Sequence, residues 1–135
     1  MDNIFRTLKK VIPKPIFKAV QPAYHYALAW VGAVTFKHPS KGLTVIAITG
    51  TKGKSSVTEL VAALLQASGK KTASLSTIQF TYNGRKERNM FKMTMPGRFF
   101  VQKFLRQAVE EGCTHAVIEM TSEGAKQFRH KFVDL

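Results

Sequence analysis

A short apolar segment that runs into a glycine-rich turn constrains this chain more than any other feature. The segment reads Val45-Ile-Ala-Ile-Thr-Gly-Thr-Lys-Gly-Lys-Ser-Ser56, which predicts a buried strand, a tight turn and the start of a helix. The backbone N–H groups of such a turn and the positive end of the helix can hold a polyphosphate. Lys54 could reach its terminal oxygens, and the Ser55 hydroxyl could bind Mg²⁺. The segment therefore predicts a nucleotide site.

The spacing of this segment differs from that of a general P-loop. A P-loop has a glycine, four residues and then Gly-Lys-Ser/Thr, but here Ile48 stands at the first glycine position and Gly50 follows two residues later. An ordinary strand–turn–helix would also explain the pattern. However, a lysine at a helix N-terminus is unfavourable unless an anion is bound there, so we favour the phosphate loop.

Length and composition limit the remaining possibilities. A chain of 135 residues can bury one modest core. Its single cysteine, Cys113, excludes an intramolecular disulfide or a zinc site built on cysteines, and favours a reducing compartment. The net charge of +13 suits nucleic acid, an anionic membrane surface or an acidic substrate equally. No RNA-recognition, zinc-finger or helix-turn-helix pattern supports the first of these.

The periodicity after residue 42 predicts an α/β fold. We expect strands over 43–49, 71–80 and 114–120, helices over 55–67, 98–111 and 125–130, a hairpin at Asn83-Gly84 with strands over 78–82 and 85–92, and half of a further strand over 132–135. This order predicts a three-layer P-loop domain with a mostly parallel sheet over 43–135, which we expect to be incomplete. A helical segment and linker over 1–42 precede it.

The N-terminal segment is basic and then apolar. Its apolar run, Pro22 to Phe36, has about 15 residues, fewer than the roughly 20 of a membrane span. It predicts either an interfacial helix, with Trp30, Tyr24 and Tyr26 at the lipid headgroups, or a helix packed on the nucleotide domain or on missing parts of the protein. A true membrane span is the third alternative. The first alternative implies a peripheral membrane contact through residues 4–36.

Two acidic residues lie at or just after the end of the strand predicted over 114–120. Glu119 closes it, and because ligands bind at the carboxyl ends of parallel strands, its carboxylate should face the same crevice as Lys54 and Ser55. A carboxylate oxygen suits Mg²⁺ held between protein and phosphate. Glu123 is a weaker metal candidate, since it could equally cap the following helix.

Three sequence blocks resemble the central domain of the Mur ligases. They are Val45 to Ser56, Met93 to Gly97 and Glu119 to Arg129, and Gly50 to Ser56 is similar to the family's loop at every position. The likeness is strongest to the branch that adds the third amino acid to UDP-N-acetylmuramoyl-dipeptide. It implies an enzyme in which ATP phosphorylates a carboxylate to an acyl phosphate that an amino-acid amine then attacks.

The resemblance also implies roles for particular residues. ATP would bind to Gly50, Thr51, Lys52, Gly53, Lys54, Ser55 and Ser56, with Lys54 as the catalytic cation. Mg²⁺ would bind to Ser55 and Glu119. The UDP-N-acetylmuramoyl-peptide would bind to Thr94, Thr121, Gln127 and Arg129, and a cytoplasmic location would follow.

The chain departs from the family pattern at several points. Glu123 stands where a histidine is usual and Met95 where a threonine is common. The UDP-binding N-terminal domain, the later part of the central domain and the amino-acid-binding C-terminal domain are not recognisable. We therefore expect this chain to be inactive alone. A non-catalytic nucleotide-binding module, a folylpolyglutamate- or cyanophycin-type ligase fragment and a nucleic-acid-binding P-loop protein remain alternatives.

Overall fold

The computed structural model describes residues 14–91 and 93–135. Predictions for residues 1–13, including the start of the proposed membrane contact, lie outside these residues.

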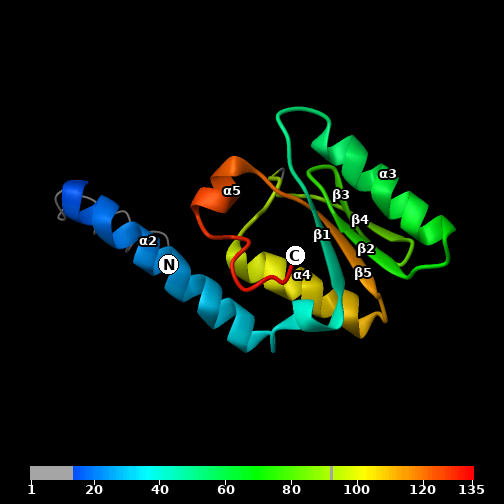
Figure 1. Cartoon of the computed structure of the whole chain (residues 1–135), viewed down its shortest axis with the longest axis horizontal. Coiled ribbons are helices and arrows are strands. Elements are labelled where there is room, and N and C mark those ends of the chain that lie inside the picture. Colours follow the sequence, from blue (N-terminus) through cyan, green and yellow to red (C-terminus); the bar gives the residue numbers. More distant parts are fainter. Residues whose placement is uncertain (1–13, 92) are drawn as a thin grey trace.

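A single five-stranded sheet organises the described residues (Figure 1). Its order is β1 (Thr44–Ile48), β5 (His115–Glu119), β2 (Thr72–Leu75), β3 (Gln79–Tyr82) and β4 (Arg85–Arg88). The strand β5 lies between β1 and β2 and runs parallel to both, whereas β3 and β4 form an antiparallel extension. In the parallel part, β5 is buried from Ala116 onward, and β2 is buried throughout although it contains Thr72 and Ser74. The strand β1 is apolar as predicted, but it lies at the sheet edge and only Val45 is buried, so the prediction of a buried first strand was wrong.

Helices cover both faces of the sheet, which confirms the predicted three-layer α/β fold. Side chains alternate between the two faces of a strand, so Ala116 and Ile118 of β5 face the core beneath α4 (Arg98–Glu110). Glu119 lies on the opposite face, where its carboxylate contacts the start of α3 (Lys54–Ala67). The large apolar core thus lies between the sheet and α4.

The helix α4 contributes the largest side chains of this core. Its apolar residues recur every three or four positions, as expected for one buried helical face. Phe104 lies between Phe80 and Tyr82, with ring centroids 6.4 and 5.1 Å away. Leu105 and Ala108 are fully buried beside it.

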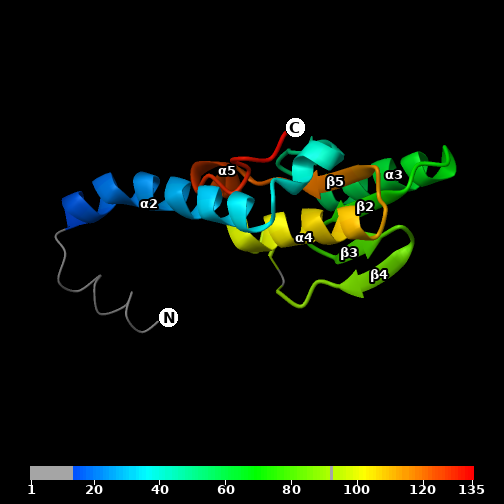
Figure 2. The ribbon, with the colours of Figure 1, turned by 90° about the horizontal axis from the view of Figure 1, so that it is seen from below.

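The N-terminal helix α2 (Lys14–Thr35) packs on α4 through small residues. Ala29, Gly32 and Ala33 are buried, and a Cβ added to Gly32 would lie 3.8 Å from the Cα of Phe99. Such close backbone approach needs small side chains. The short helix η1 (Pro39–Gly42) then leads into β1. Figure 2 shows α2 extending beyond the sheet layer, and the prediction of a helix packed on the nucleotide domain is confirmed for this inner face.

The outer face of α2 remains apolar and exposed. Trp30 keeps 52% of its surface accessible, and Val31 and Val34 are also exposed. Among the described residues, no helix has the length and apolar character needed to cross a membrane. The interfacial contact therefore stays a prediction.

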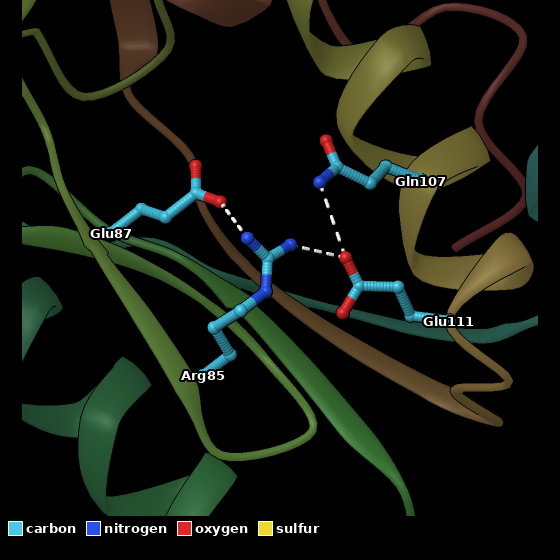
Figure 3. A network of polar contacts seen from close by, with 4 residues as sticks. All are labelled: Arg85, Glu87, Gln107 and Glu111. Carbon is cyan, nitrogen blue, oxygen red and sulfur yellow. Dashed lines mark hydrogen bonds and ion pairs between the residues drawn. The ribbon is translucent and has the colours of Figure 1, made fainter.

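The β3–β4 hairpin is held against the C-terminal end of α4 by a polar network (Figure 3). Arg85 donates to Glu87 at 2.5 Å and also pairs with Glu111, which accepts a hydrogen bond from Gln107 at 3.2 Å. The turn itself is the predicted Asn83-Gly84, with φ of 47° and 92°. These positive angles suit Asn and Gly, so the predicted hairpin is confirmed.

Three predicted elements were wrong. The strand predicted over 71–80 ends at Leu75, because the Ser76 hydroxyl accepts bonds from the N–H groups of Ile78 and Gln79 and turns the chain. The helix predicted over 125–130 is α5 (Ser122–Lys126). It begins earlier because the Thr121 hydroxyl caps it, accepting a bond from the N–H of Gly124 at 3.0 Å.

The third wrong element is the strand predicted over 132–135. These residues form no strand: Phe132 has a left-handed φ of 60°, and its ring packs edge-on against Tyr26 of α2 at 5.1 Å. The Gln102 amide donates to the Phe132 carbonyl at 3.2 Å. Contacts with α2 and α4 therefore determine the conformation of this segment, rather than pairing with the sheet.

The position of Leu105 gives a direct test of this core. Leu105→Ala removes buried methyl groups and leaves a cavity, so the free energy of unfolding should fall by about 2–5 kcal/mol in urea titrations. Leu64→Ala is the matched control, because Leu64 is 62% exposed on α3. An equal loss in both variants would contradict the assignment of the core to the α4 face.

Candidate functional site

The predicted phosphate loop joins β1 to α3 and depends on two glycines. Gly50 has φ of 152° and Gly53 has φ of 75°, values that L side chains rarely adopt. The Lys54 ammonium donates to the Gly50 carbonyl at 3.0 Å. The loop therefore curls back on itself with its lysine lying across it.

The start of α3 has no side-chain cap. Gly53 occupies the N-cap position, and the first helical bond runs from the N–H of Val57 to the Gly53 carbonyl at 2.9 Å. The N–H groups of the preceding positions are thus unsatisfied by a capping side chain. Together with the partial positive charge of the helix end, they favour an anion at this point.

The Glu119 carboxylate lies directly behind this loop. It is only 2% exposed, and one oxygen, Oε2, accepts a hydrogen bond from the Ser55 hydroxyl at 2.9 Å. The same oxygen accepts from the N–H of Thr77 at 2.8 Å and from its hydroxyl at 2.9 Å. The structure therefore brings together Ser55 and Glu119, the two predicted metal ligands.

Thr77 is a site residue that the sequence analysis missed. Its only hydroxyl proton goes to Glu119, so the 2.8 Å hydrogen bond between Thr77 and Thr94 must be donated by Thr94. Thr77 thereby connects the loop side of the site to Thr94. Ending the predicted strand at Leu75 would have placed Thr77 at the same sheet edge as Glu119, but a strand drawn to residue 80 concealed it.

The donors present fit a magnesium ion bound together with a nucleotide. Mg²⁺ usually takes one or two carboxylates and completes its shell with waters and phosphate oxygens, and Glu119 with Ser55 supplies one carboxylate and one hydroxyl. The described residues contain no group of three His, Cys, Asp or Glu side chains able to hold a metal by themselves. Glu123 is exposed and accepts a hydrogen bond from the Gln127 amide at 3.0 Å.

The remaining residues predicted to bind the UDP-N-acetylmuramoyl-peptide lie around α5. Arg129 donates to the backbone carbonyl of Met95 and, at 2.8 Å, to the side chain of Gln127. Met95 directly follows Thr94, so these residues are close to one another. Thr121 differs, because its hydroxyl is engaged as the cap of α5.

Close packing fixes the position of α5 relative to the loop that contains Thr94 and Met95. A Cβ added to Gly124 would lie 2.7 Å from the sulfur of the fully buried Met95. Glycine at this position therefore lets the Met95 loop approach α5 closely enough for the Arg129 contact.

The comparisons with known proteins agree with this arrangement of strand, loop and acidic strand end. The family model for the Mur ligase middle domain matches residues 48–135. The chain belongs to this family. The resemblance seen in the three sequence blocks is thereby confirmed for the Mur ligase segment.

Relatives of this Mur ligase chain include enzymes of two names. It is 35% identical to UDP-N-acetylmuramyl-tripeptide synthetase of Treponema pallidum, covering 81% of this chain and 20% of that protein. For the synthetase of the same name from Latilactobacillus sakei the identity is 39%, over 76% of this chain and 20% of the relative. A UDP-N-acetylmuramoyl-L-alanyl-D-glutamate–2,6-diaminopimelate ligase of Syntrophomonas wolfei is 34% identical, over 84% of this chain and 23% of that protein. The chain spans about a fifth of these relatives.

A solved structure shows the same fold. The structure titled UDP-N-acetylmuramoyl-L-alanyl-D-glutamate–2,6-diaminopimelate ligase matches with a TM-score of 0.59 and 26% identity, over 67% of this chain and 18% of that one. The Mur ligase fold assignment therefore rests on both sequence and structure.

The hydroxyl of Thr77 can be tested separately from its backbone. In Thr77→Val, Glu119 loses one buried donor and Thr94 loses its acceptor, so the free energy of unfolding should fall by about 1–2 kcal/mol. Thr77→Ser keeps the hydroxyl and should stay within about 0.5 kcal/mol of the wild type in the same urea titration. Equal stability of the valine variant and the wild type would contradict the network.

Proposed function

We propose that this chain forms the nucleotide-binding part of an ATP-dependent ligase that adds an amino acid to a UDP-N-acetylmuramoyl-peptide. The observation that carries the proposal is the 2.9 Å contact between Ser55, at the start of α3, and the buried Glu119. It places a hydroxyl and a carboxylate beside an uncapped helix N-terminus. Polyphosphate and divalent cation are the ligands that such a combination favours.

In this proposal the loop binds ATP through residues 50–56. The backbone N–H groups hold the phosphates, and Lys54 leaves the Gly50 carbonyl to contact the terminal phosphate. Ser55 and Glu119 would hold Mg²⁺, which when bound neutralises charge on the phosphates. The γ-phosphoryl group would pass to a substrate carboxylate, giving an acyl phosphate and ADP. The amino-acid amine would then attack the acyl carbon, forming the amide bond and releasing inorganic phosphate and a proton.

The UDP-N-acetylmuramoyl-peptide, which accepts the phosphoryl group, would bind next to the proposed ATP and Mg²⁺ site. Thr94 lies one hydrogen bond from Thr77, and Thr77 lies one from Glu119, so a substrate held at Thr94 is within reach of the phosphate site. Gln127 and Arg129 would contact the UDP-N-acetylmuramoyl-peptide on the same side. Thr121 would contribute mainly by capping α5 and positioning this segment.

Two of the substrates named in the proposal, ATP and the UDP-N-acetylmuramoyl-peptide, are nucleotides, and this supports a cytoplasmic location. The exposed face of α2 around Trp30 is the part of the described chain to which a peripheral membrane contact would be assigned. That contact is not needed for the chemistry proposed here.

The role of Lys54 is tested by binding of ATP. Lys54→Ala should reduce Mg-ATP affinity at least 100-fold, or beyond detection in calorimetry, because a charge-assisted contact to phosphate and the cation itself are lost. Lys70→Ala, just beyond the other end of α3, is the matched control and should bind as the wild type does. Retained affinity in Lys54→Ala would refute the phosphate role.

The metal role of Glu119 needs a different measurement. Glu119→Gln should bind ATP without the gain in affinity that Mg²⁺ gives the wild type, because the neutral amide is a poor ligand for a hard cation. Glu123→Gln should keep that gain, since Glu123 is exposed and bonded to Gln127. An unchanged magnesium dependence in Glu119→Gln would show that the ion binds elsewhere.

A further inference from the structure

Three basic or titratable side chains from three separate segments meet beside the Thr94 loop. His25 comes from α2, Arg98 from the first turn of α4, and Arg129 from the segment after α5; we call them the basic cluster. Arg98 donates to Nδ1 of His25 and, at 2.9 Å, to the Gln127 carbonyl. Arg129 donates to the Gln127 side chain as well. The cluster therefore converges around Gln127.

The two guanidinium groups of the basic cluster have only neutral acceptors among their described hydrogen-bond partners. These are backbone carbonyls, an amide oxygen and an imidazole nitrogen. The ion pairs of the described residues involve other arginines, Arg85 and Arg106. Burial and then the charge of Arg129 lower the pKa of Arg98. Like charges held together without a counter-ion repel each other, and an oxyanion between them would remove that cost.

His25 is set up to respond to such an anion. Burial first, and then the charges of Arg98 and Arg129, lower the pKa of its imidazole. Because Arg98 can only donate, Nδ1 must accept, and the neutral ring carries its proton on Nε2. The Gln21 amide nitrogen lies 3.3 Å from Nε2 and is itself a donor, so the amide must turn its oxygen towards the ring to accept this proton. Tyr24 lies against the same ring at 5.6 Å.

The position of the cluster indicates which ligand would supply the anion. Arg129 bonds to the carbonyl of Met95, the residue after Thr94, and Thr94 is connected through Thr77 to Glu119. The cluster is therefore the outer end of one chain of contacts that begins at the phosphate loop. If the UDP-N-acetylmuramoyl-peptide lies along this series of contacts, its reacting carboxylate is near the phosphate loop. The far end of the substrate then reaches the basic cluster.

We propose that His25 and Arg98 join Arg129 in binding an anionic group of the acceptor substrate, so that the N-terminal helix α2 supplies part of the substrate site. The inference rests on the proposed function. Only the role of Arg129 follows from the family resemblance; His25 and Arg98 are assigned from their contacts. Paired guanidinium groups suit the two oxygens of a carboxylate or a phosphate.

The test measures binding of two probes to the same protein by calorimetry. The only anionic groups of UDP are phosphates, and the only anionic groups of N-acetylmuramoyl-L-alanyl-D-glutamate are carboxylates. Arg98→Gln should weaken binding of one of them roughly ten-fold or more, and the probe affected identifies the anion. Arg106→Gln is the matched control, because Arg106 lies on the same helix and pairs with Glu110 at 2.8 Å. Circular dichroism checks that each variant is folded.

The pH dependence of binding adds a readout that a merely structural role would not change. A bound anion favours the imidazolium form and raises the pKa of His25, so affinity for the carboxylate probe should increase as pH falls from about 7.5 to about 5.5. The carboxylate probe is used because the terminal phosphate of UDP takes up a proton in this range. His25→Gln should remove this slope. His130→Gln should keep it, although His130 follows Arg129 and its own pKa is lowered by burial and then by Lys131. Glu123 contacts the cluster only through Gln127.

Two results would overturn the proposal. One is binding of both probes by Arg98→Gln and His25→Gln with the affinity and pH slope of the wild type. The other is failure of the wild type to bind either probe. The proposed function is judged separately, because Mg-ATP binding by the Lys54 and Glu119 variants does not involve the basic cluster.

Discussion

A buried carboxylate at the end of β5 determines the arrangement of the candidate site. Burying a charge is costly unless it is hydrogen-bonded or paired, and Glu119 meets this requirement with donors from Ser55 and Thr77. Those donors lie at the start of α3 and just beyond the end of β2. The hydrogen bonds of one carboxylate therefore hold three segments together at the carboxyl edge of the sheet, beside the predicted phosphate loop that follows β1.

The elements with strong local patterns were predictable from sequence, and those shaped by distant contacts were not. The apolar runs that form β1 and β5, the periodicity of α4 and the turn at Asn83-Gly84 each act over a few residues. The end of β2 depends instead on Ser76, whose hydroxyl also donates to Glu59 of α3 at 2.8 Å. Nothing in the neighbouring sequence signals that bond.

The same distinction applies to the candidate site. Ser55 and Glu119 could be predicted because each belongs to a motif or closes an apolar strand. Thr77, Arg98 and His25 could not, because their partners lie 42, 29 and 73 positions away. For a similar reason, the sequence of the N-terminal helix was compatible both with contact to lipid and with packing on protein. Its inner face is small and apolar at Ala29 and Ala33, and such a face is compatible with lipid or with protein until α4 is in place.

The distribution of charge links these observations to function. The chain has 21 Lys and Arg against 8 Asp and Glu, so most cations cannot find a carboxylate. Exposed cations such as Lys70 are solvated at little cost, whereas Arg98 and Arg129 are partly buried and close together. Positive charge held at an energetic cost beside the residues predicted to bind the substrate is better explained by the proposed anionic substrate than by a diffuse attraction to nucleic acid, which scattered surface charges would serve equally well.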